Sequence, residues 1–260
     1  MLFSLNNGGL ILHLFENGVE KEWHYYLTYI GFVLLTIVGA YLFGSINSSI
    51  IISKTLYHDD VRKHGSGNAG MTNMLRTYGK GAAGLTLLGD MLKTALAVLL
   101  AGILFGFNYA GGVSVGDGFC YVAGLFAVLG HIFPAYYGFK GGKGVLATAT
   151  MALIVSPLPF VILFALFVLI VWISKYVSLG SVIVGILYPV VLHGYFTLRF
   201  AEAEKSLPGL VAFSTITLAI LIVWCHRGNL QRISNRTERK ISFKKKPKTE
   251  EGESENAEEK

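Results

Sequence analysis

HGSGNAGMTNMLRTYGKGAAGLTLLGDMLK, residues 64–93, is a glycine-rich polar loop that leads directly into an apolar segment. Glycines in this loop can adopt positive φ angles, which let successive backbone N–H groups point at one anion. The residues expected to surround that anion are Arg62, Lys63, Ser66, Gly67, Asn68, Gly70, Thr72, Asn73, Arg76 and Lys80. We interpret the loop as a phosphate-binding site, and the alternative is a flexible connector between two helices. It is not a Walker loop, because Gly79-Lys80 is followed by Gly81.

The composition is typical of a polytopic membrane protein. Hydrophobic residues make up 53% of the chain and charged residues only 15%, and the mean hydropathy is +0.55. Soluble proteins average about 25% charged residues, so a soluble domain is disfavoured. The two cysteines, Cys120 and Cys225, lie far apart in apolar stretches and indicate neither a disulfide framework nor a zinc site.

Apolar stretches of about 20 residues can cross a bilayer, and their succession predicts an all-α, seven-span helical bundle. The predicted spans are residues 25–53, 81–107, 119–137, two within 145–173, 181–198 and 208–224. The stretch 145–173 is divided because Pro157 and Pro159 are expected to end a helix rather than kink it. This leaves an N-terminal extension at residues 1–24, a seven-span domain at 25–230, and a charged tail at 231–260 whose end we expect to be disordered.

The distribution of lysine and arginine predicts the orientation. With seven spans, eighteen of these residues fall on the side of the first glycine loop, and only Lys21, Arg199 and Lys205 fall on the other. The positive-inside rule then places this loop, a second glycine loop at residues 139–144 and the C-terminus in the cytoplasm, with the N-terminus outside. Six spans would move the ten basic residues from Arg227 onward to the other side.

This topology brings polar groups from distant segments to one membrane face. The groups that meet there, besides the first loop, are Ser45, Gly141, Gly142, Lys143, Gly144, Ser181, His226 and Asn229. We expect Lys143 and its glycines to bind one phosphate, and Arg62 with the first loop to bind another. The alternatives are helix packing for Ser45 and interfacial anchoring for His226.

Lys93 lies inside the second predicted span, where a lysine is costly unless it is paired or faces a polar cavity. Asp90, three residues earlier, lies on the same helical face. The first interpretation is a structural Asp90–Lys93 ion pair, and the alternative is a role in a substrate cavity.

Six motifs in this order resemble those of the bacterial acyl-phosphate:glycerol-3-phosphate acyltransferases, the PlsY family. The motifs are GSIN (44–47), VRKHGSGNAGMTNMLR (61–76), GDMLK (89–93), GHIFPAYYGFKGGKGV (130–145), KYVSLGS (175–181) and HRGNLQR (226–232). The resemblance covers residues 25–239. The chain departs from the family at Asn47 and Ala69, where proline is usual, and at Thr94, where glycine is usual.

The resemblance implies an enzyme of the bacterial cell membrane that catalyses the first step of phospholipid synthesis. It would transfer a fatty acyl group from acyl phosphate to the sn-1 hydroxyl of glycerol 3-phosphate, giving lysophosphatidic acid and phosphate. No metal, other cofactor or acyl-CoA is implied. The expected partners are the two substrates and the lipid bilayer, with functional coupling to the enzyme that makes acyl phosphate and with no nucleic acid.

The resemblance also implies roles for single residues. Those expected to be catalytic are Ser45, Lys143, His226 and Asn229. Those expected to bind substrate are Arg62, Ser66, Gly67, Asn68, Gly70, Thr72, Asn73, Lys93, His131, Gly141, Gly142, Gly144 and Ser181. The proton acceptor is left open between His131, His226 and a substrate phosphate oxygen.

Other classes of membrane protein are less consistent with the pattern. A transporter for a phosphorylated solute would also use basic groups and broken helices, but its site would lie near the bilayer midplane rather than on one face. A non-catalytic scaffold would have no need for so many hydrogen-bond donors. Acyltransferases that use acyl-CoA or acyl carrier protein directly carry a His-x-x-x-x-Asp pair, and none of the seven histidines has aspartate five residues on.

Overall fold

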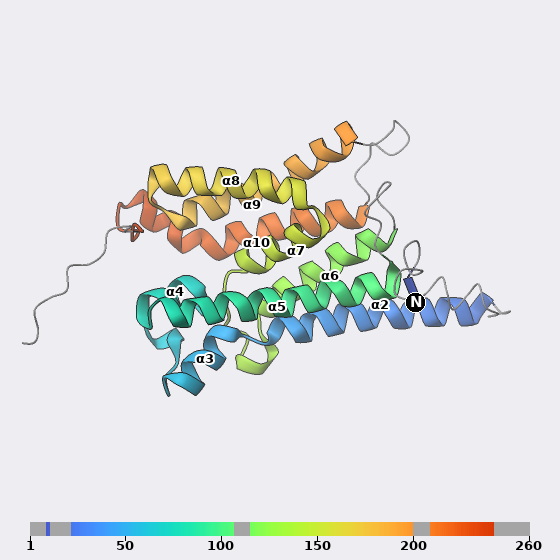
Figure 1. The fold of residues 1–260 in the computed structure, drawn as a ribbon, viewed down its shortest axis with the longest axis horizontal. Helices are drawn as coiled ribbons and strands as arrows, with labels where there is room; N and C mark the ends of the chain where they lie inside the picture. The colour runs from blue at the N-terminus through green and yellow to red at the C-terminus, as the bar shows by residue number, and fades with distance from the viewer. Residues whose placement is uncertain (1–8, 11–21, 107–114, 200–208, 242–260) are drawn as a thin grey trace, which may run out of the picture.

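The chain forms an all-α bundle, as predicted. The computed structural model describes residues 9–10, 22–106, 115–199 and 209–241, and these residues contain no strand. The helices are α2 (Glu22–Ser45), α3 (Ser48–Leu56), α4 (Met71–Thr77), α5 (Lys80–Phe105), α6 (Val115–Ile132), α7 (Val145–Val155), α8 (Pro157–Ser174), α9 (Val177–Arg199) and α10 (Gly209–Ser234). The long helices run roughly along the long axis of the molecule (Figure 1). Most of the predicted N-terminal extension and the end of the charged tail lie outside the described residues.

Six helical segments of the described chain are long and apolar enough to cross a membrane. They are Tyr26–Leu56, Lys80–Phe105, Asp117–Tyr137, Pro157–Ser174, Val177–Leu198 and Gly209–Ser234. The predicted fourth span corresponds to α7, which has 11 residues. At about 1.5 Å per residue it is roughly half as long as a hydrocarbon core is thick. Seven spans and the orientation therefore remain predictions.

The predicted division of residues 145–173 is confirmed. Helix α7 ends at Val155, and Pro157 lies in the first turn of α8. Proline is tolerated there because the first N–H groups of a helix have no intrahelical partner. Ser156 lies between the two helices, and its backbone N–H donates to the Ala152 carbonyl at 2.8 Å.

Two predicted boundaries were wrong. The first span breaks after Ser45, because Asn47 caps a new helix by accepting a hydrogen bond from the Ile50 N–H at 3.1 Å. The last span was predicted to end at residue 224, but α10 continues to Ser234. Its extra turns are polar in sequence yet partly buried, since Asn229 is only 9% exposed.

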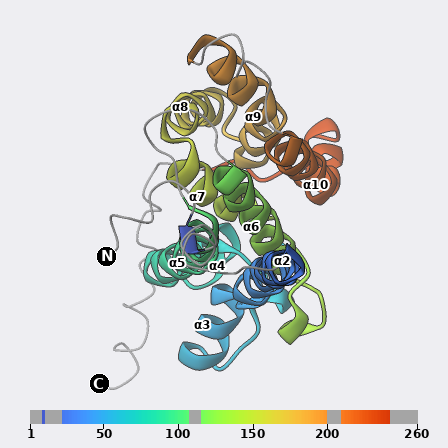
Figure 2. The same ribbon diagram turned by 90° about the vertical axis from the view of Figure 1, so that its right-hand side faces the viewer.

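Helix α6 lies at the centre of the bundle and packs against α2, α5, α7 and α10 (Figure 2). Glycines allow its close approach to α2. A Cβ on Gly130 would lie 2.2 Å from the Tyr41 carbonyl oxygen, and one on Gly44 would lie 2.1 Å from that of Ala127. Small residues at such contacts are typical of helix packing in membranes. The bundle therefore has a closely packed centre.

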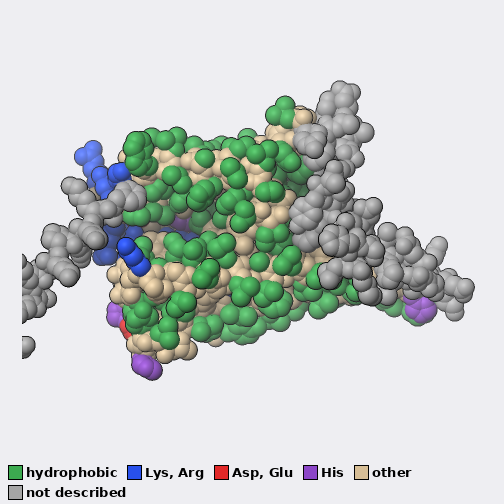
Figure 3. Space-filling model, viewed as in Figure 1, with side chains coloured by type: hydrophobic (Ala, Val, Ile, Leu, Met, Phe, Trp, Pro, Cys, Tyr) green, Lys and Arg blue, Asp and Glu red, His purple; other side chains and the backbone are tan. Residues whose placement is uncertain are grey.

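The outer surface fits a lipid environment. Apolar side chains cover the sides of the bundle, whereas lysine and arginine gather at one end (Figure 3). Exposed apolar residues include Leu88 on α5 and Trp172 on α8, which are 64% and 65% exposed. In water such a surface would favour aggregation, but in a bilayer it contacts lipid tails.

Candidate active site

The first glycine loop has a defined structure that depends on Asn73. The Asn73 side chain accepts a hydrogen bond from the Ser66 N–H at 2.9 Å and donates to the Val61 and His64 carbonyls, each at 3.0 Å. Gly65 has φ +60°, and a Cβ there would lie 2.2 Å from Asn73 Oδ1. The loop therefore depends on glycine at this position and on an amide that is fully engaged within the protein.

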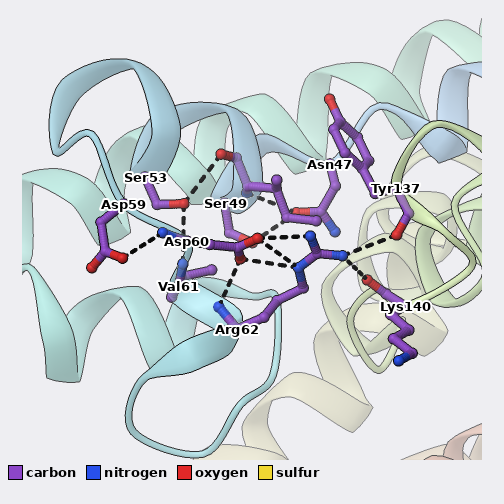
Figure 4. Close-up of polar contacts among 10 residues, drawn as sticks. Asn47, Ser49, Ser53, Asp59, Asp60, Val61, Arg62, Tyr137 and Lys140 are labelled. Atoms are coloured by element: carbon purple, nitrogen blue, oxygen red, sulfur yellow. Dashed lines mark hydrogen bonds and ion pairs between the residues drawn. The ribbon is translucent and has the colours of Figure 1, made fainter.

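Arg62 joins the two glycine loops. Its Nε and Nη2 atoms donate to the Asp60 carboxylate at 3.0 and 2.7 Å, and its Nη1 donates to the Tyr137 and Lys140 carbonyls at 2.9 and 3.3 Å (Figure 4). The hydrogen bond from Arg62 lowers the pKa of the Asp60 carboxyl to about 2. The guanidinium thus holds the loop before α7 against the loop before α4.

The second glycine loop packs on the end of α6. The Gly141 and Gly142 N–H groups donate to the Ile132 and His131 carbonyls at 3.1 and 3.0 Å. A Cβ on Gly142 would lie 2.0 Å from His131 Nε2, and one on Gly141 would lie 2.0 Å from the His131 carbonyl oxygen. Close packing, which only glycine allows here, therefore fixes the position of Lys143.

Lys143 faces α10 rather than a carboxylate. Its Nζ donates to Asn229 Oδ1. Burial lowers the pKa of Lys143 to about 8, against a weaker upward effect of Glu238. A lysine with this pKa remains mostly charged at neutral pH and can bind an anion.

Glu238, which lies beyond α10, completes this cluster. Its Oε1 accepts hydrogen bonds from Asn229 Nδ2 at 2.6 Å and Ser178 Oγ at 2.9 Å, and its Oε2 accepts from Arg232 Nε at 2.7 Å. Burial raises the pKa of Glu238, but these hydrogen bonds lower it by more, and the net shift is downward. The carboxylate thus connects α9 to α10 at the polar end of the bundle.

A cavity of about 370 Å³ opens beside Lys143. Its polar end is lined by Ser66, Asn68, Thr72, Arg76, Lys143, Asn229 and Glu238. An apolar arm extends from there between α7, α8, α9 and α10, lined by Leu146, Ala149, Ala152, Phe160, Leu163, Phe164 and Tyr188. Histidine and basic side chains are visible in a hollow of the otherwise apolar side of the molecule (Figure 3). The shape suits an amphiphile with an anionic head.

A second, more polar cavity of about 530 Å³ lies next to the first. Both cavities are lined by Ser66, Asn68, Lys143 and Asn229. The second adds arginines of α10, Arg227 and Arg232. The Lys143–Asn229 pair therefore borders both spaces and can contact a molecule in either.

Comparison with known proteins identifies the family. A profile for glycerol-3-phosphate acyltransferase matches residues 34–236. The chain belongs to this family. Glycerol-3-phosphate acyltransferases of Mycoplasmopsis agalactiae and Bacillus subtilis are 38% and 36% identical to it over 230 and 211 residues. Those alignments cover 81% of this chain and 94% and 98% of the relatives.

Two solved structures of PlsY, an integral membrane glycerol 3-phosphate acyltransferase, share the fold. The glycerol 3-phosphate form has a TM-score of 0.68 at 32% identity and covers 81% of this chain and 96% of that one. The lysophosphatidic acid form has a TM-score of 0.66 at 31% identity, with coverage of 81% and 95%. This chain is thus an integral membrane acyltransferase of the PlsY type.

Most of the residues predicted for the acyltransferase site border one of the two cavities. The first cavity is lined by Ser66, Asn68, Gly70, Thr72, Asn73, His131, Lys143, Gly144, Ser181, His226 and Asn229. A further predicted residue, Gly67, lines the second cavity. Five predicted residues line neither cavity in the part of the chain that the structure describes: Ser45, Arg62, Lys93, Gly141 and Gly142. Their direct contact with substrate remains a prediction.

Lys93 belongs to a buried polar cluster beneath the first cavity. Its Nζ donates to the Ile46 carbonyl at 2.7 Å and lies 3.0 Å from His131 Nδ1, and it forms an ion pair with Asp90 Oδ1 at 3.0 Å. The predicted Asp90–Lys93 ion pair is therefore present. Asp90 and His131 line the cavity, so the cluster supports its wall.

Ser45 is likewise engaged within the protein. It is fully buried, its Oγ donates to the Tyr41 carbonyl at 2.8 Å, and it accepts a hydrogen bond from the Ala135 N–H at 3.2 Å. The hydroxyl therefore holds the end of α2 against the loop that follows α6.

The geometry distinguishes the two candidate bases. His226 Nδ1 lies 2.8 Å from the Ile222 carbonyl, which can only accept, so Nδ1 carries the proton and Nε2 is left as an acceptor. His131 Nδ1 instead accepts from Lys93, which leaves its Nε2 as the donor. Only His226 has the tautomer that a base at the cavity requires.

Sequence reasoning missed several groups at the polar end, namely Ser178, Arg232, Glu238 and Arg239. Residues 231–260 were predicted to be a charged tail, and no site residue was predicted within them. Residues 235–241 instead fold back, and the Ile241 N–H donates to the Lys175 carbonyl at 2.9 Å. One signal was present: Glu238 interrupts a series of arginines directly after the last motif. A lone acid among bases often has a specific partner.

Proposed function

We propose that this acyltransferase transfers a fatty acyl group from acyl phosphate to the sn-1 hydroxyl of glycerol 3-phosphate. The products are lysophosphatidic acid and phosphate. The observation that carries the proposal is the first cavity, in which a polar end beside Lys143 continues into an apolar arm. Acyl phosphate has the same division, with a compact anion joined directly to a hydrocarbon chain.

The two cavities suggest where each substrate lies. The acyl chain fits the apolar arm, which leaves its phosphate near Arg76 and Lys143. Glycerol 3-phosphate has no apolar part and fits the second cavity, where Arg227 and Arg232 supply charge. Lys143 and Asn229 border both cavities, so the carbonyl carbon and the attacking hydroxyl would meet beside them.

The reaction requires little covalent help from the protein. The sn-1 oxygen attacks the carbonyl carbon, the carbon–oxygen bond to phosphate breaks, and phosphate leaves with the bonding electron pair. The hydroxyl proton passes to His226 Nε2 or to a phosphate oxygen. Lys143 stabilises the charge that develops on the carbonyl oxygen and the departing phosphate.

One assay tests the reaction. Purified protein in detergent is supplied with palmitoyl phosphate and glycerol 3-phosphate, and lysophosphatidate and phosphate are measured. We expect both products in a one-to-one ratio. A parallel reaction receives palmitoyl-CoA in place of palmitoyl phosphate. Turnover with the CoA ester but not with acyl phosphate would contradict the proposal.

We further propose that the polar end faces the cytoplasm, where glycerol 3-phosphate is available, and that the chain spans the membrane seven times. Lysine and arginine gather at this end (Figure 3), which supports the orientation. Cysteines introduced at position 68 and within residues 109–118 test it, in a Cys225→Ser background that retains the buried Cys120. An impermeant thiol reagent added to intact cells should label only the cysteine within residues 109–118. The opposite labelling would reverse the orientation.

A further inference from the structure

The apolar arm of the cavity ends inside the bundle. Its lining residues extend along α9 as far as Tyr188 and along α7 as far as Ala152, and the first lining residue of α8 is Phe160. Helix α7 ends and α8 begins part-way along the molecule (Figure 1), so the chain turns at the depth where the arm stops. Ala152 and Tyr188 are 4% and 3% exposed. The arm is therefore closed by packed protein at this end.

The closed end is held by hydrogen bonds. Tyr188 Oη lies 3.2 Å from Ser156 Oγ, and Ser156 Oγ lies 3.2 Å from the Ala152 carbonyl oxygen. Tyr188 Oη can donate to Ser156 Oγ, which donates to the Ala152 carbonyl, so both hydroxyls have a partner within the protein. The proline break between α7 and α8 thus places a closely packed surface across the arm.

We propose that Ala152, Phe160 and Tyr188 form a floor that determines how the enzyme discriminates between acyl chains of different length. The proposal rests on the proposed function, in which the arm holds the acyl chain of acyl phosphate. Acyl carbons above the floor are buried in protein, and further carbons must bend out through the side of the molecule into lipid. The floor is thus a specificity determinant and takes no part in bond making.

The dimensions set the expected length. Ser181 lies near the polar end, and Tyr188 follows it by seven residues on α9. The two levels are therefore about 10 Å apart along the helix. An extended hydrocarbon chain advances about 1.3 Å per carbon, so roughly eight carbons fit between these levels. Each buried methylene should raise kcat/KM about fourfold until the floor is reached, and further carbons should add little.

A chain-length series tests the proposal. For the wild-type protein, kcat/KM is measured with saturated acyl phosphates from hexanoyl to hexadecanoyl at fixed glycerol 3-phosphate. We expect a steep rise followed by a plateau. Ala152→Leu should move the start of the plateau to chains about two carbons shorter, because the larger side chain raises the floor by about that much. Ala149→Leu, one turn nearer the polar end, should move it by about three carbons more.

A substitution that should shift the plateau in the opposite direction distinguishes a change in the floor from a loss of folding. Phe160→Ala removes a half-buried ring from the floor and should move the plateau to longer chains. Leu153→Ala is the matched control, because Leu153 follows Ala152 directly but is 40% exposed on the outside of α7. Its profile should match that of the wild type.

Three outcomes are distinguishable. Shifts of opposite sign in Ala152→Leu and Phe160→Ala, with an unchanged KM for glycerol 3-phosphate, support the floor. Unchanged profiles in folded, active variants would overturn it and leave the proposed function intact. Absence of wild-type turnover with acyl phosphates of every length would overturn both.

Discussion

The two glycine loops look alike in sequence but are built in different ways. The first is held by side chains, because Asn73 hydrogen-bonds its backbone and the Arg62–Asp60 pair closes its base. The second is held by backbone packing, since Gly141 and Gly142 lie directly against α6. Glycine takes positive φ angles in both loops, as at Gly65 and Gly144, but only in the second does it let the loop backbone pack directly against another helix.

The basic residues of the two loops differ in the same way. Arg62 donates to a carboxylate and two carbonyls of the protein. Lys143 instead faces a cavity, and within the described chain its side chain hydrogen-bonds only to the neutral side chain of Asn229. A basic residue beside glycines is thus not by itself a phosphate ligand. Its partners decide whether the charge remains available for substrate.

The largest expected effect is at Lys143. Lys143→Ala removes a charge-assisted hydrogen bond to phosphate, a loss of about 1.5–3 kcal/mol. This corresponds to a fall of about 10- to 150-fold in kcat/KM. Lys143→Arg should also lose activity, because the guanidinium is bulkier and forked.

The control for this prediction is Lys140→Ala. Lys140 lies in the same loop but lines neither cavity among the described residues, so its substitution should change kcat/KM little. Wild-type kcat/KM in folded Lys143→Ala would show that the second loop is only a connector.

Gly142→Ala tests whether the second loop depends on packing. The new methyl would lie 2.0 Å from His131 Nε2 and 2.7 Å from the Ala69 carbonyl oxygen, so the loop must shift. Overpacking of this kind costs about 1–3 kcal/mol. We expect a lower melting temperature and a higher KM. Gly81→Ala on α5 has open space around it and should leave both unchanged. Equal behaviour of the two variants would remove the distinction between the loops.

The pH dependence tests the availability of the Lys143 charge. Burial lowers its pKa to about 8 from the ordinary 10.5, so the charged form is lost as pH rises through 8. If this charge binds phosphate, kcat/KM for glycerol 3-phosphate should fall about tenfold between pH 7 and pH 9. Lys143→Arg should retain a flat, lower profile over this range, because arginine remains protonated. A fall that persists unchanged in Lys143→Arg would assign the titration to another group.

The smallest expected effect separates the two interpretations of Arg62. Asp60→Asn weakens the Arg62–Asp60 pair without removing a basic residue, and should destabilise the protein by about 1 kcal/mol, because the pair is only partly buried. If Arg62 acts by joining the loops, Arg62→Ala should also lower the melting temperature, and the double variant should be less destabilised than the sum of the two. A raised KM in Arg62→Ala with unchanged stability would instead favour direct phosphate binding.

Much of the architecture could be predicted from local chemistry. The break at Pro157 follows from the geometry of proline, and the membrane class follows from composition. The break at Asn47 was missed, because an asparagine in an apolar run is ambiguous until its side chain has a backbone N–H to accept from. The Asp90–Lys93 pair was predicted from spacing, but its third member, His131, comes from another helix.

The sequence by itself determined that this protein lies in a membrane, where its main helix break falls, and which loops hold glycines able to take positive φ angles. These properties depend on the residues themselves and on their near neighbours. Only the tertiary structure decided that Arg62 is engaged while Lys143 faces a cavity, that Glu238 folds back onto Ser178 and Asn229, and that the apolar arm stops at Tyr188. The hydrogen bonds among these join residues 9 to 86 positions apart in the chain, and the end of the arm depends on the space between helices. Local sequence determines neither the distant partners nor that space.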